Sequence, residues 1–285
     1  MLEARSAWAD PIFSPDGRQL ALTINDGRQS DIFIYDWARD ALSRLTLDPA
    51  SDQQPAWTPD GRRVSFSSSR AESGSINLYW QRADGTGEVQ RLTTSREPQL
   101  NGSWHPSGHV LALTERHADT NLDLMMLQVD GDETSGWKPG TPTVFLNGPY
   151  AETLPAFSPD GRWIAYTSTE GGLPEVYVRP YPGPGGKWKV SNGFGTQPMW
   201  SAARRELFYT TAVRTIQVVS YEIAGTEFQA AKPRPWSTTR FRLRPSSVGR
   251  ALTLHPDGTR FALAPESIAT TPPRYDKLVA VFNAF

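Results

Sequence analysis

The sequence predicts an all-β fold built from six similar units, and three observations support this prediction. A short turn motif recurs at steps of 43 to 54 residues, each copy separates two short apolar runs typical of β-strands, and no segment shows a sustained helical period. The copies are FSPDGR, WTPDGR, WHPSGH, FSPDGR, the degraded WSAARR and LHPDGT, which begin at Phe13, Trp57, Trp104, Phe157, Trp200 and Leu254.

The first unit shows the order of elements that the later units repeat. A short first strand at 11–13 leads into the turn Ser14–Gly17, where proline presets φ and glycine takes the left-handed conformation that closes a hairpin. Second, third and fourth strands are expected at 19–23, 31–35 and 42–47. Four antiparallel strands in each of six units predict a six-bladed β-propeller.

The remaining elements follow from the same order. Third strands are expected at 77–80, 123–127, 175–178 and 215–221, and fourth strands at 90–93, 143–146, 187–190 and 235–238. The last unit supplies strands at 252–254, 260–264 and 277–282, which leaves it one strand short. Thr46, in the fourth strand that precedes the second turn, lies twelve positions before Thr58 of that turn. Counting twelve positions back from Ser14, the equivalent residue of the first turn, reaches Leu2. Residues 2–5 are therefore predicted to complete the sixth blade, so that no sheet edge stays open.

One domain with six blades is expected, at approximately 7–47, 54–94, 101–147, 154–191, 197–239, and 250–285 together with 1–6. The formal net charge of −1 argues against binding to nucleic acid or to a membrane surface, because one sign of charge should then dominate. The absence of cysteine excludes disulfides and thiolate chemistry. No apolar run approaches the length of a membrane span, so this segment is not expected to insert into a membrane, and a monomer is expected.

The recurring turn, followed by strands such as IAYTS and then DIFIYD or EVYVRP, resembles the repeats of TolB-like six-bladed β-propellers. Longer stretches, including SDIFIYDWARDALSRLTLDPASDQQPAWTPDGRRVSFSS and the terminal KLVAVFNAF, are similar to the propeller carried C-terminally by many bacterial serine/threonine protein kinases of the eukaryotic-like type. The likeness covers essentially the whole chain and departs from the pattern at Ser107 and at Ala202–Arg204. It implies the fold, a periplasmic or other extracytoplasmic location in a bacterium, and fusion to a kinase domain, whose own motifs are absent from this sequence.

Several conspicuous residues are predicted to be structural. The turn serines and aspartates recur with the hairpins, which does not suit a single active site. His105 and His255 occupy the turn position of Ser or Thr and are expected to bond locally, and His109 is expected at the surface. An acid or amide opens four third strands and is expected to bond to the adjoining loop, at Asp31, Asn77, Asp123 and Glu175. The alternative role of these residues is to bind calcium or another divalent ion in the central channel of the propeller, which needs several oxygens converging on one site. No cofactor is predicted.

Candidate functional residues are expected at one end of the sheets. The first strands begin there and the loops between second and third strands lie there, around the channel mouth. The residues at the first-strand starts are all polar: Asp10, Gln54, Asn101, Thr153, Gln197 and Arg250. Further charged residues are expected on the same face. They are Asp52, Arg70, Glu152, Glu170 and His117, together with Arg242 and Arg244 of a long connection in the 54-residue fifth unit. No zinc-ligand spacing and no G-x-S-x-G motif occurs, so no catalytic or metal-binding residue is assigned.

The predicted function is a non-enzymatic binding, sensor or scaffold module that recognises a protein or a small anionic ligand at this mouth. Arginine side chains there could hold a carboxylate or a phosphate. The alternative is a hydrolase in the channel, with or without the help of a metal ion, that uses Asp10 or Glu152 together with His117.

Overall fold

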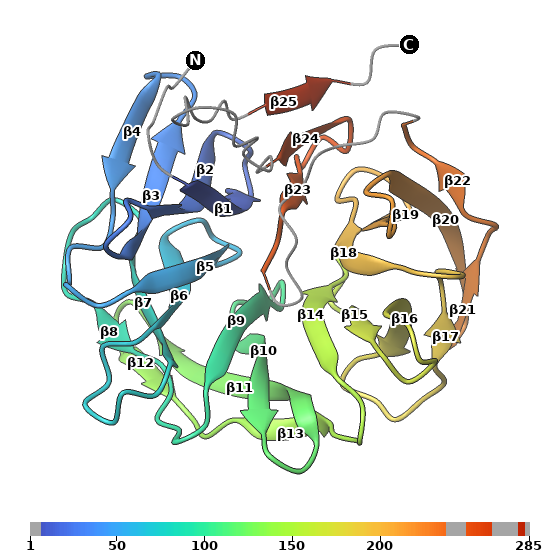
Figure 1. Cartoon of the computed structure of the whole chain (residues 1–285), viewed down its shortest axis with the longest axis horizontal. Helices are drawn as coiled ribbons and strands as arrows, with labels where there is room; N and C mark the ends of the chain where they lie inside the picture. Colours follow the sequence, from blue (N-terminus) through green and yellow to red (C-terminus); the bar gives the residue numbers. More distant parts are fainter. Residues whose placement is uncertain (1–6, 238–248, 264–278, 283–285) are drawn as a thin grey trace. The chain divides into compact units, whose positions relative to one another are not determined.

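The computed structural model describes residues 7–237, 249–263 and 279–282, and every regular element among them is a β-strand (Figure 1). Within these residues, 25 strands form six antiparallel sheets that follow one another in chain order. The predicted all-β class is confirmed. In the described part of the chain, nothing forms a helix long and apolar enough to cross a bilayer.

The contacts divide the chain into two compact units. Unit 1 comprises residues 1–101 and 242–285 and holds the first, second and sixth sheets. Unit 2 comprises residues 102–241 and holds the third, fourth and fifth sheets, so the boundary lies inside the first strand of the third sheet.

In unit 1, consecutive strands pair as hairpins. The first sheet contains β1 (Ala7–Phe13), β2 (Gln19–Asn25), β3 (Ser30–Asp36) and β4 (Ala41–Arg44). The second sheet contains β5 (Asp52–Trp57), β6 (Arg63–Ser68), β7 (Asn77–Arg82) and β8 (Gln90–Arg91). The described strands of the sixth sheet are β23 (Leu252–Leu254), β24 (Arg260–Leu263) and β25 (Val279–Phe282).

In unit 2, two of the three sheets carry a fifth strand. The third sheet contains β9 (Gln99–Trp104), β10 (Val110–His117), β11 (Asn121–Asp132), β12 (Gly136–Pro139) and β13 (Thr143–Leu146). The fourth sheet contains β14 (Glu152–Phe157), β15 (Trp163–Ser168), β16 (Glu175–Pro180) and β17 (Trp188–Lys189). The fifth sheet contains β18 (Thr196–Trp200), β19 (Glu206–Thr210), β20 (Ile216–Ala224), β21 (Glu227–Ala230) and β22 (Arg234–Pro235).

The extra strands correct the sequence prediction. The third strands β11 and β20 run beyond their predicted ends and fold back as the hairpins β11/β12 and β20/β21. These insertions lie in the two longest repeats, so part of the additional chain that was predicted for the mouth of the fifth unit is hairpin instead. The predicted fourth strand at 235–238 is β22, Arg234–Pro235. The predicted closing strand at 2–5 and the arginines Arg242 and Arg244 lie outside the described residues.

Apolar side chains from neighbouring sheets pack against one another. In unit 1, Ile32 of β3, Trp57 of β5 and Phe66 of β6 belong to one buried cluster. In unit 2, Trp163 of β15 and Phe228 of β21 belong to another. Central strands such as β6 and β15 are buried along their whole length.

The turn motif works as hairpin chemistry, as predicted. Ser14 Oγ donates to Asp16 Oδ1 at 2.6 Å and accepts from the Gln19 amide at 2.9 Å, and Gly17 has a φ of 72°. Asp16 Oδ1 also accepts from the Arg18 amide at 3.0 Å. The same contacts recur in the turns of the second and fourth sheets. These serines and aspartates therefore hold the turns together.

Histidine performs the turn role in the third sheet and adds a contact to the next sheet. His105 Nδ1 accepts from the Ser107 amide at 3.1 Å, which confirms the predicted local bond. Its Nε2 then carries the proton and donates to the carbonyl of Gly161 at 3.1 Å, in the turn of the fourth sheet. Tyr181 packs beside the histidine ring, with ring centroids 5.5 Å apart.

We expect Gly161→Ala to destabilise the protein by about 2–4 kcal/mol, because positive-φ strain and overpacking act together. Gly161 has a φ of 70°, and a Cβ there would lie 2.3 Å from His105 Nε2. Gly172→Ala is the matched control, since Gly172 has a φ of 87° with nothing within 4 Å of its Cβ position. Urea unfolding should give the larger loss for Gly161→Ala. Equal losses would mean that the contact between the turns contributes nothing.

Candidate functional site

Four first strands contain a bulge near their starts. The register shifts there, and one residue of each bulge has a positive φ. These residues are Asp10, Gln54, Leu154 and Gln197, with φ between 50° and 57°. Two sequence-predicted residues are displaced from this pattern. Thr153 and Arg250 lie one residue before the equivalent positions, which are Leu154 and Ala251.

In unit 1, Asp10 links the first and sixth sheets. Its carboxylate accepts from the Arg250 amide at 2.9 Å and from Thr23 Oγ1 at 3.1 Å, and its own amide donates to the Arg250 carbonyl at 3.0 Å. Burial raises the pKa of Asp10, and these hydrogen bonds oppose the rise. Burial also lowers the pKa of the Arg250 guanidinium to about 10, against the attraction of Asp10.

The chain of hydrogen bonds continues from the first sheet to β9. The Gln54 amide donates to Thr23 Oγ1 at 3.2 Å, and Ser67 Oγ donates to Gln54 Oε1 at 3.1 Å. The Asn101 amide donates to Ser67 Oγ at 2.8 Å, and Asn101 Nδ2 donates to the Gln54 carbonyl at 2.9 Å. The predicted mouth residues of unit 1 are thus linked, partly to one another and partly through the hydroxyl groups of Thr23 and Ser67 on the second strands.

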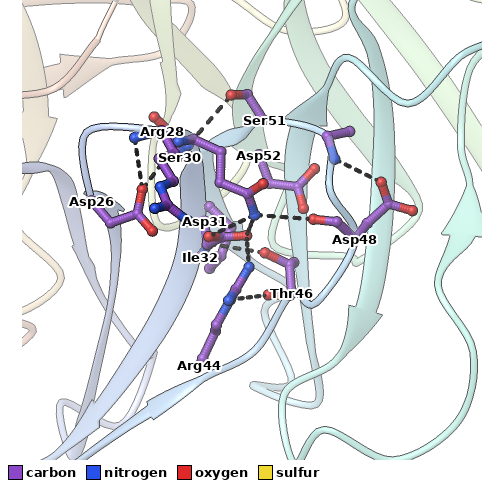
Figure 2. Close-up of polar contacts among 12 residues, drawn as sticks. Asp26, Arg28, Ser30, Asp31, Ile32, Arg44, Thr46, Asp48, Ser51 and Asp52 are labelled. Atoms are coloured by element: carbon purple, nitrogen blue, oxygen red, sulfur yellow. Dashed lines mark hydrogen bonds and ion pairs between the residues drawn. The ribbon is translucent and has the colours of Figure 1, made fainter.

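Figure 2 shows the polar network at the start of β3. Both carboxylate oxygens of Asp31 lie 3.2 Å from Gln29 Nε2, and Oδ1 lies 2.8 Å from Arg44 Nη2. Arg44 Nε also donates to the Thr46 carbonyl at 2.8 Å. Asp31 therefore bonds to the adjoining loop before β3, through Gln29, as predicted. Asn77 and Glu175 likewise bond to loops, accepting from the amides of Ser95 at 2.9 Å and Gly193 at 2.8 Å.

Beside this network, Asp52 and Arg70 form a buried ion pair. Arg70 Nη2 lies 2.7 Å from Asp52 Oδ2, and Arg70 Nε donates to Ser68 Oγ at 2.8 Å. The guanidinium also lies over the rings of Phe66 and Tyr79, at 5.4 and 5.1 Å from their centroids. Burial raises the pKa of Asp52, and Ser68 and Arg70 oppose the rise. Asp52 Oδ1 is buried without a hydrogen-bond partner among the described residues.

In unit 2, the structure brings His117 and Glu152 together in one acidic cluster. Its carboxylates are Glu115, Asp123, Glu152 and Glu170. His117 is the last residue of β10 rather than a loop residue, and its Nε2 lies 3.0 Å from Glu115 Oε1 and 3.9 Å from Asp123 Oδ2. Glu152 Oε1 accepts from Ser168 Oγ at 3.2 Å. Within the described ranges, Asp123 Oδ1 and Glu152 Oε2 are buried without hydrogen-bond partners. Asp123 Oδ2 accepts a hydrogen bond from Thr120 Oγ1 in the adjoining loop, as predicted, so only its Oδ1 is left without a partner there.

The surroundings of Glu152 shift its pKa upward. Burial raises the pKa of Glu152, the hydrogen bond from Ser168 opposes the rise, and the nearby charges of Asp123 and Glu170 add to it. Lys187 lowers the pKa by a smaller effect. Lys187 is bound instead to Glu170, with Nζ 2.6 Å from Oε1. The cluster consequently holds more carboxylates than cations.

The other predicted residues of unit 2 are buried parts of the sheets. Thr153 pairs with Thr167 across β14 and β15, and Gln197 is buried in the bulge of β18. Sequence reasoning did not assign Glu115 to the site, and it gave Asp123 only a structural role. In the parts of the chain that the structure describes, no three His, Asp or Glu side chains are arranged to hold a metal ion.

Comparison with known proteins places this chain among β-propellers. Residues 3–149 match the model of the TolB beta propeller domain family. An uncharacterized protein of Agrobacterium fabrum is 29% identical over 54% of this chain and 52% of its own length, and the Tol-Pal system protein TolB of Wolinella succinogenes is 27% identical over 55% and 36%. The chain thus spans about half or less of these relatives. The structure of a putative TolB from Agrobacterium tumefaciens superposes with a TM-score of 0.64 at 17% identity, covering 81% of this chain and 83% of that one.

Proposed function

This chain belongs to the TolB beta propeller domain family, and from that premise we propose that it is a non-enzymatic protein-recognition module. The proposed binding surface is made of the loops at the first-strand end of the sheets of unit 2. In each antiparallel sheet, the loop before the first strand and the loop between the second and third strands lie at this end. The turn motifs lie at the other end.

The distribution of exposed apolar side chains carries this proposal. Six large apolar side chains are exposed among the described residues, and four of them lie in first-strand-end loops: Leu47, Tyr150, Leu173 and Val213. A contiguous exposed apolar patch marks a protein interaction site, whereas single scattered side chains do not, so the proposal depends on the neighbouring pair Tyr150 and Leu173 of unit 2. Aromatic and aliphatic anchors also dominate binding energy at protein interfaces.

Two of these side chains lie on loops that are bonded to each other. The Ala151 amide donates to Thr169 Oγ1 at 3.0 Å, and the Thr169 amide donates to the Ala151 carbonyl at 3.2 Å. Tyr150 is 43% exposed on the first loop and Leu173 is 54% exposed on the second. We name these two loops, residues 147–151 and 169–174, the docking loops. They adjoin Glu152, so an apolar surface is next to an acidic one.

The alternatives have less support. A small anionic ligand would depend on Arg242 and Arg244, which lie outside the described residues, and on Arg250, whose backbone is bonded to Asp10. The docking loops adjoin acids instead. For the hydrolase alternative, Glu152 and His117 lie in the same acidic cluster of unit 2, but no three His, Asp or Glu side chains among the described residues are arranged to hold a metal ion.

We also propose that the six sheets are the blades of one closed propeller, with residues 2–5 as the fourth strand of the sixth sheet. The described part of that sheet has three strands, whereas the other sheets have four or five, which supports the proposal. Fusion to a kinase domain in a longer bacterial protein, and an extracytoplasmic location, are proposals that rest on the sequence resemblance.

Selection of a phage-displayed library of 12-residue peptides on the immobilised protein tests the proposed function. We expect enriched peptides to bind the double variant Tyr150→Ser/Leu173→Ser at least about tenfold more weakly, since removal of interface anchors costs 2 kcal/mol or more. Val144→Ser is the matched control, because Val144 is equally exposed on β13, away from the docking loops. Peptides that bind the double variant as tightly as the parent, or no enrichment at all, would contradict the proposal.

A further inference from the structure

We propose that the acidic cluster beside the docking loops receives the guanidinium group of an arginine side chain from the protein partner. The receiving groups are Glu152, Asp123 and Glu170. The inference rests on the proposed function, since it specifies the partner's chemistry at the same surface. Its main support is a comparison between two sheets of this chain.

The second and fourth sheets carry equivalent positions with opposite charges. Asp52 pairs with Ser68 across β5 and β6, and Glu152 pairs with Ser168 across β14 and β15, in the same register. Two residues after each serine, the second sheet has Arg70 and the fourth sheet has Glu170. The fourth sheet therefore keeps the buried acid and its serine but lacks the arginine that pairs with the acid.

The aromatic surface beneath that arginine is kept as well. Arg70 lies over Phe66 and Tyr79, whose rings are stacked with centroids 6.5 Å apart. The paired residues at the same positions of the fourth sheet are Tyr166 and Tyr177, which are stacked with centroids 6.0 Å apart. An incoming guanidinium would find an acid, a hydroxyl and aromatic rings in the arrangement that Arg70 uses.

The charges around the cluster favour a cation. Glu115, Asp123, Glu152 and Glu170 supply four carboxylates, and Asp123 Oδ1 and Glu152 Oε2 are buried without partners among the described residues. The nearby cations are Lys187, on Glu170, and Arg179, whose Nε donates to the Tyr166 hydroxyl at 3.1 Å. His117 adds positive charge only when it is protonated. Acid is thus in excess at neutral pH.

An arginine fits this site better than a lysine. Guanidinium is planar, presents five donors and stacks on aromatic rings, whereas an ammonium is a compact point charge. The Lys187–Glu170 pair is partly exposed, with side chains 33% and 23% accessible, so an arriving guanidinium can displace Lys187 and reach Glu152. Lys187 Nζ lies over the Tyr177 ring, 5.2 Å from the centroid, so the arriving guanidinium takes over this ring contact and Lys187 moves into solvent.

Titration with Nα-acetyl-arginine amide, followed by amide chemical shifts, tests the site. We expect saturable shifts at Ser168, Gly171 and Gly172, and none with the citrulline analogue, which has the same shape without the charge. Glu152→Gln should weaken arginine binding by about tenfold or more. Glu222→Gln is the matched control and should leave binding unchanged, because Glu222 pairs with Arg205 at the exposed surface of β20. Equal shifts with arginine and citrulline would overturn the proposal.

Glu170→Arg gives a second, independent readout. This change places an arginine where Arg70 lies in the second sheet, so it should fill the site from within and abolish arginine binding in a protein that stays folded. Arginine binding that survives Glu170→Arg would overturn the proposal.

The two proposals fail separately. Peptides that depend on Tyr150 and Leu173 but show no requirement for arginine would contradict only the guanidinium site. Arginine binding without any such peptide would support the site and contradict the docking loops.

Discussion

Replacing Arg70 by alanine is expected to lower the free energy of unfolding by about 3–5 kcal/mol, the cost of leaving a buried charge without its partner. Asp52 is fully buried, and Arg70 Nη2 at 2.7 Å is the cation that faces it. The substitution also removes the guanidinium from the rings of Phe66 and Tyr79. Urea unfolding at pH 7, with the midpoint and slope determined for both proteins, measures the loss.

The loss should depend on pH in a defined direction. Burial already raises the pKa of Asp52 above its ordinary value of 3.8, so the folded state holds this proton more tightly than the unfolded state does. Ionisation of Asp52 therefore opposes folding as pH rises through the raised pKa, and without Arg70 the opposition is stronger. The difference between parent and Arg70→Ala should be smallest near pH 4 and should grow toward pH 7. A difference that shrinks over this range would contradict the role given to Arg70.

Two further variants separate the buried charge from general effects. Asp52→Asn combined with Arg70→Ala should recover much of the stability, because no uncompensated charge remains. Arg205→Ala breaks an exposed ion pair with Glu222, whose side chains are mostly accessible, and should change stability little. If Arg205→Ala costs as much as Arg70→Ala, burial is not what makes the Asp52–Arg70 pair important.

The turn motif made the sheet order predictable, whereas strand extents depended on contacts that it does not encode. Proline and glycine at fixed spacing place each hairpin between two apolar runs, so β1/β2, β5/β6 and β14/β15 follow from local sequence. The bulges at Asp10 and Gln54 are different. They are stabilised by hydrogen bonds to Thr23, on another strand, and such non-local bonds leave no local pattern.

The candidate site was partly visible in the sequence. His117 and Glu152 were assigned to the first-strand end because that end follows from the strand order. Asp123 was interpreted as structural because its equivalents are, and only the structure shows that its Oδ1 lacks a partner within the described part of the chain. The exchange of Arg70 for Glu170 was available from the sequence. Both residues lie eleven positions after the turn proline, so aligning the repeats at that position would have revealed it.

The inserted hairpin of the fifth sheet carries the second large effect. Phe228→Ala is expected to lower the free energy of unfolding by about 3–5 kcal/mol, as for other buried phenylalanines. Phe228 of β21 is 1% exposed, and its ring lies 5.5 Å from Trp163 and 5.0 Å from Tyr221, centroid to centroid. Phe228→Leu keeps most of the volume and should cost less, which denaturant unfolding of the three proteins would show.

The hairpin β11/β12 of the third sheet provides the matched comparison. Trp137 of β12 is also an aromatic residue on an inserted strand, but it is only half-buried, with the His109 ring 6.1 Å away. Trp137→Ala should therefore cost clearly less than Phe228→Ala, although it removes a larger side chain. Equal costs would show that Phe228 is not part of the core between the fourth and fifth sheets. The expected inequality follows from burial, because one insertion covers the edge of the core cluster around Trp163 and the other extends into solvent.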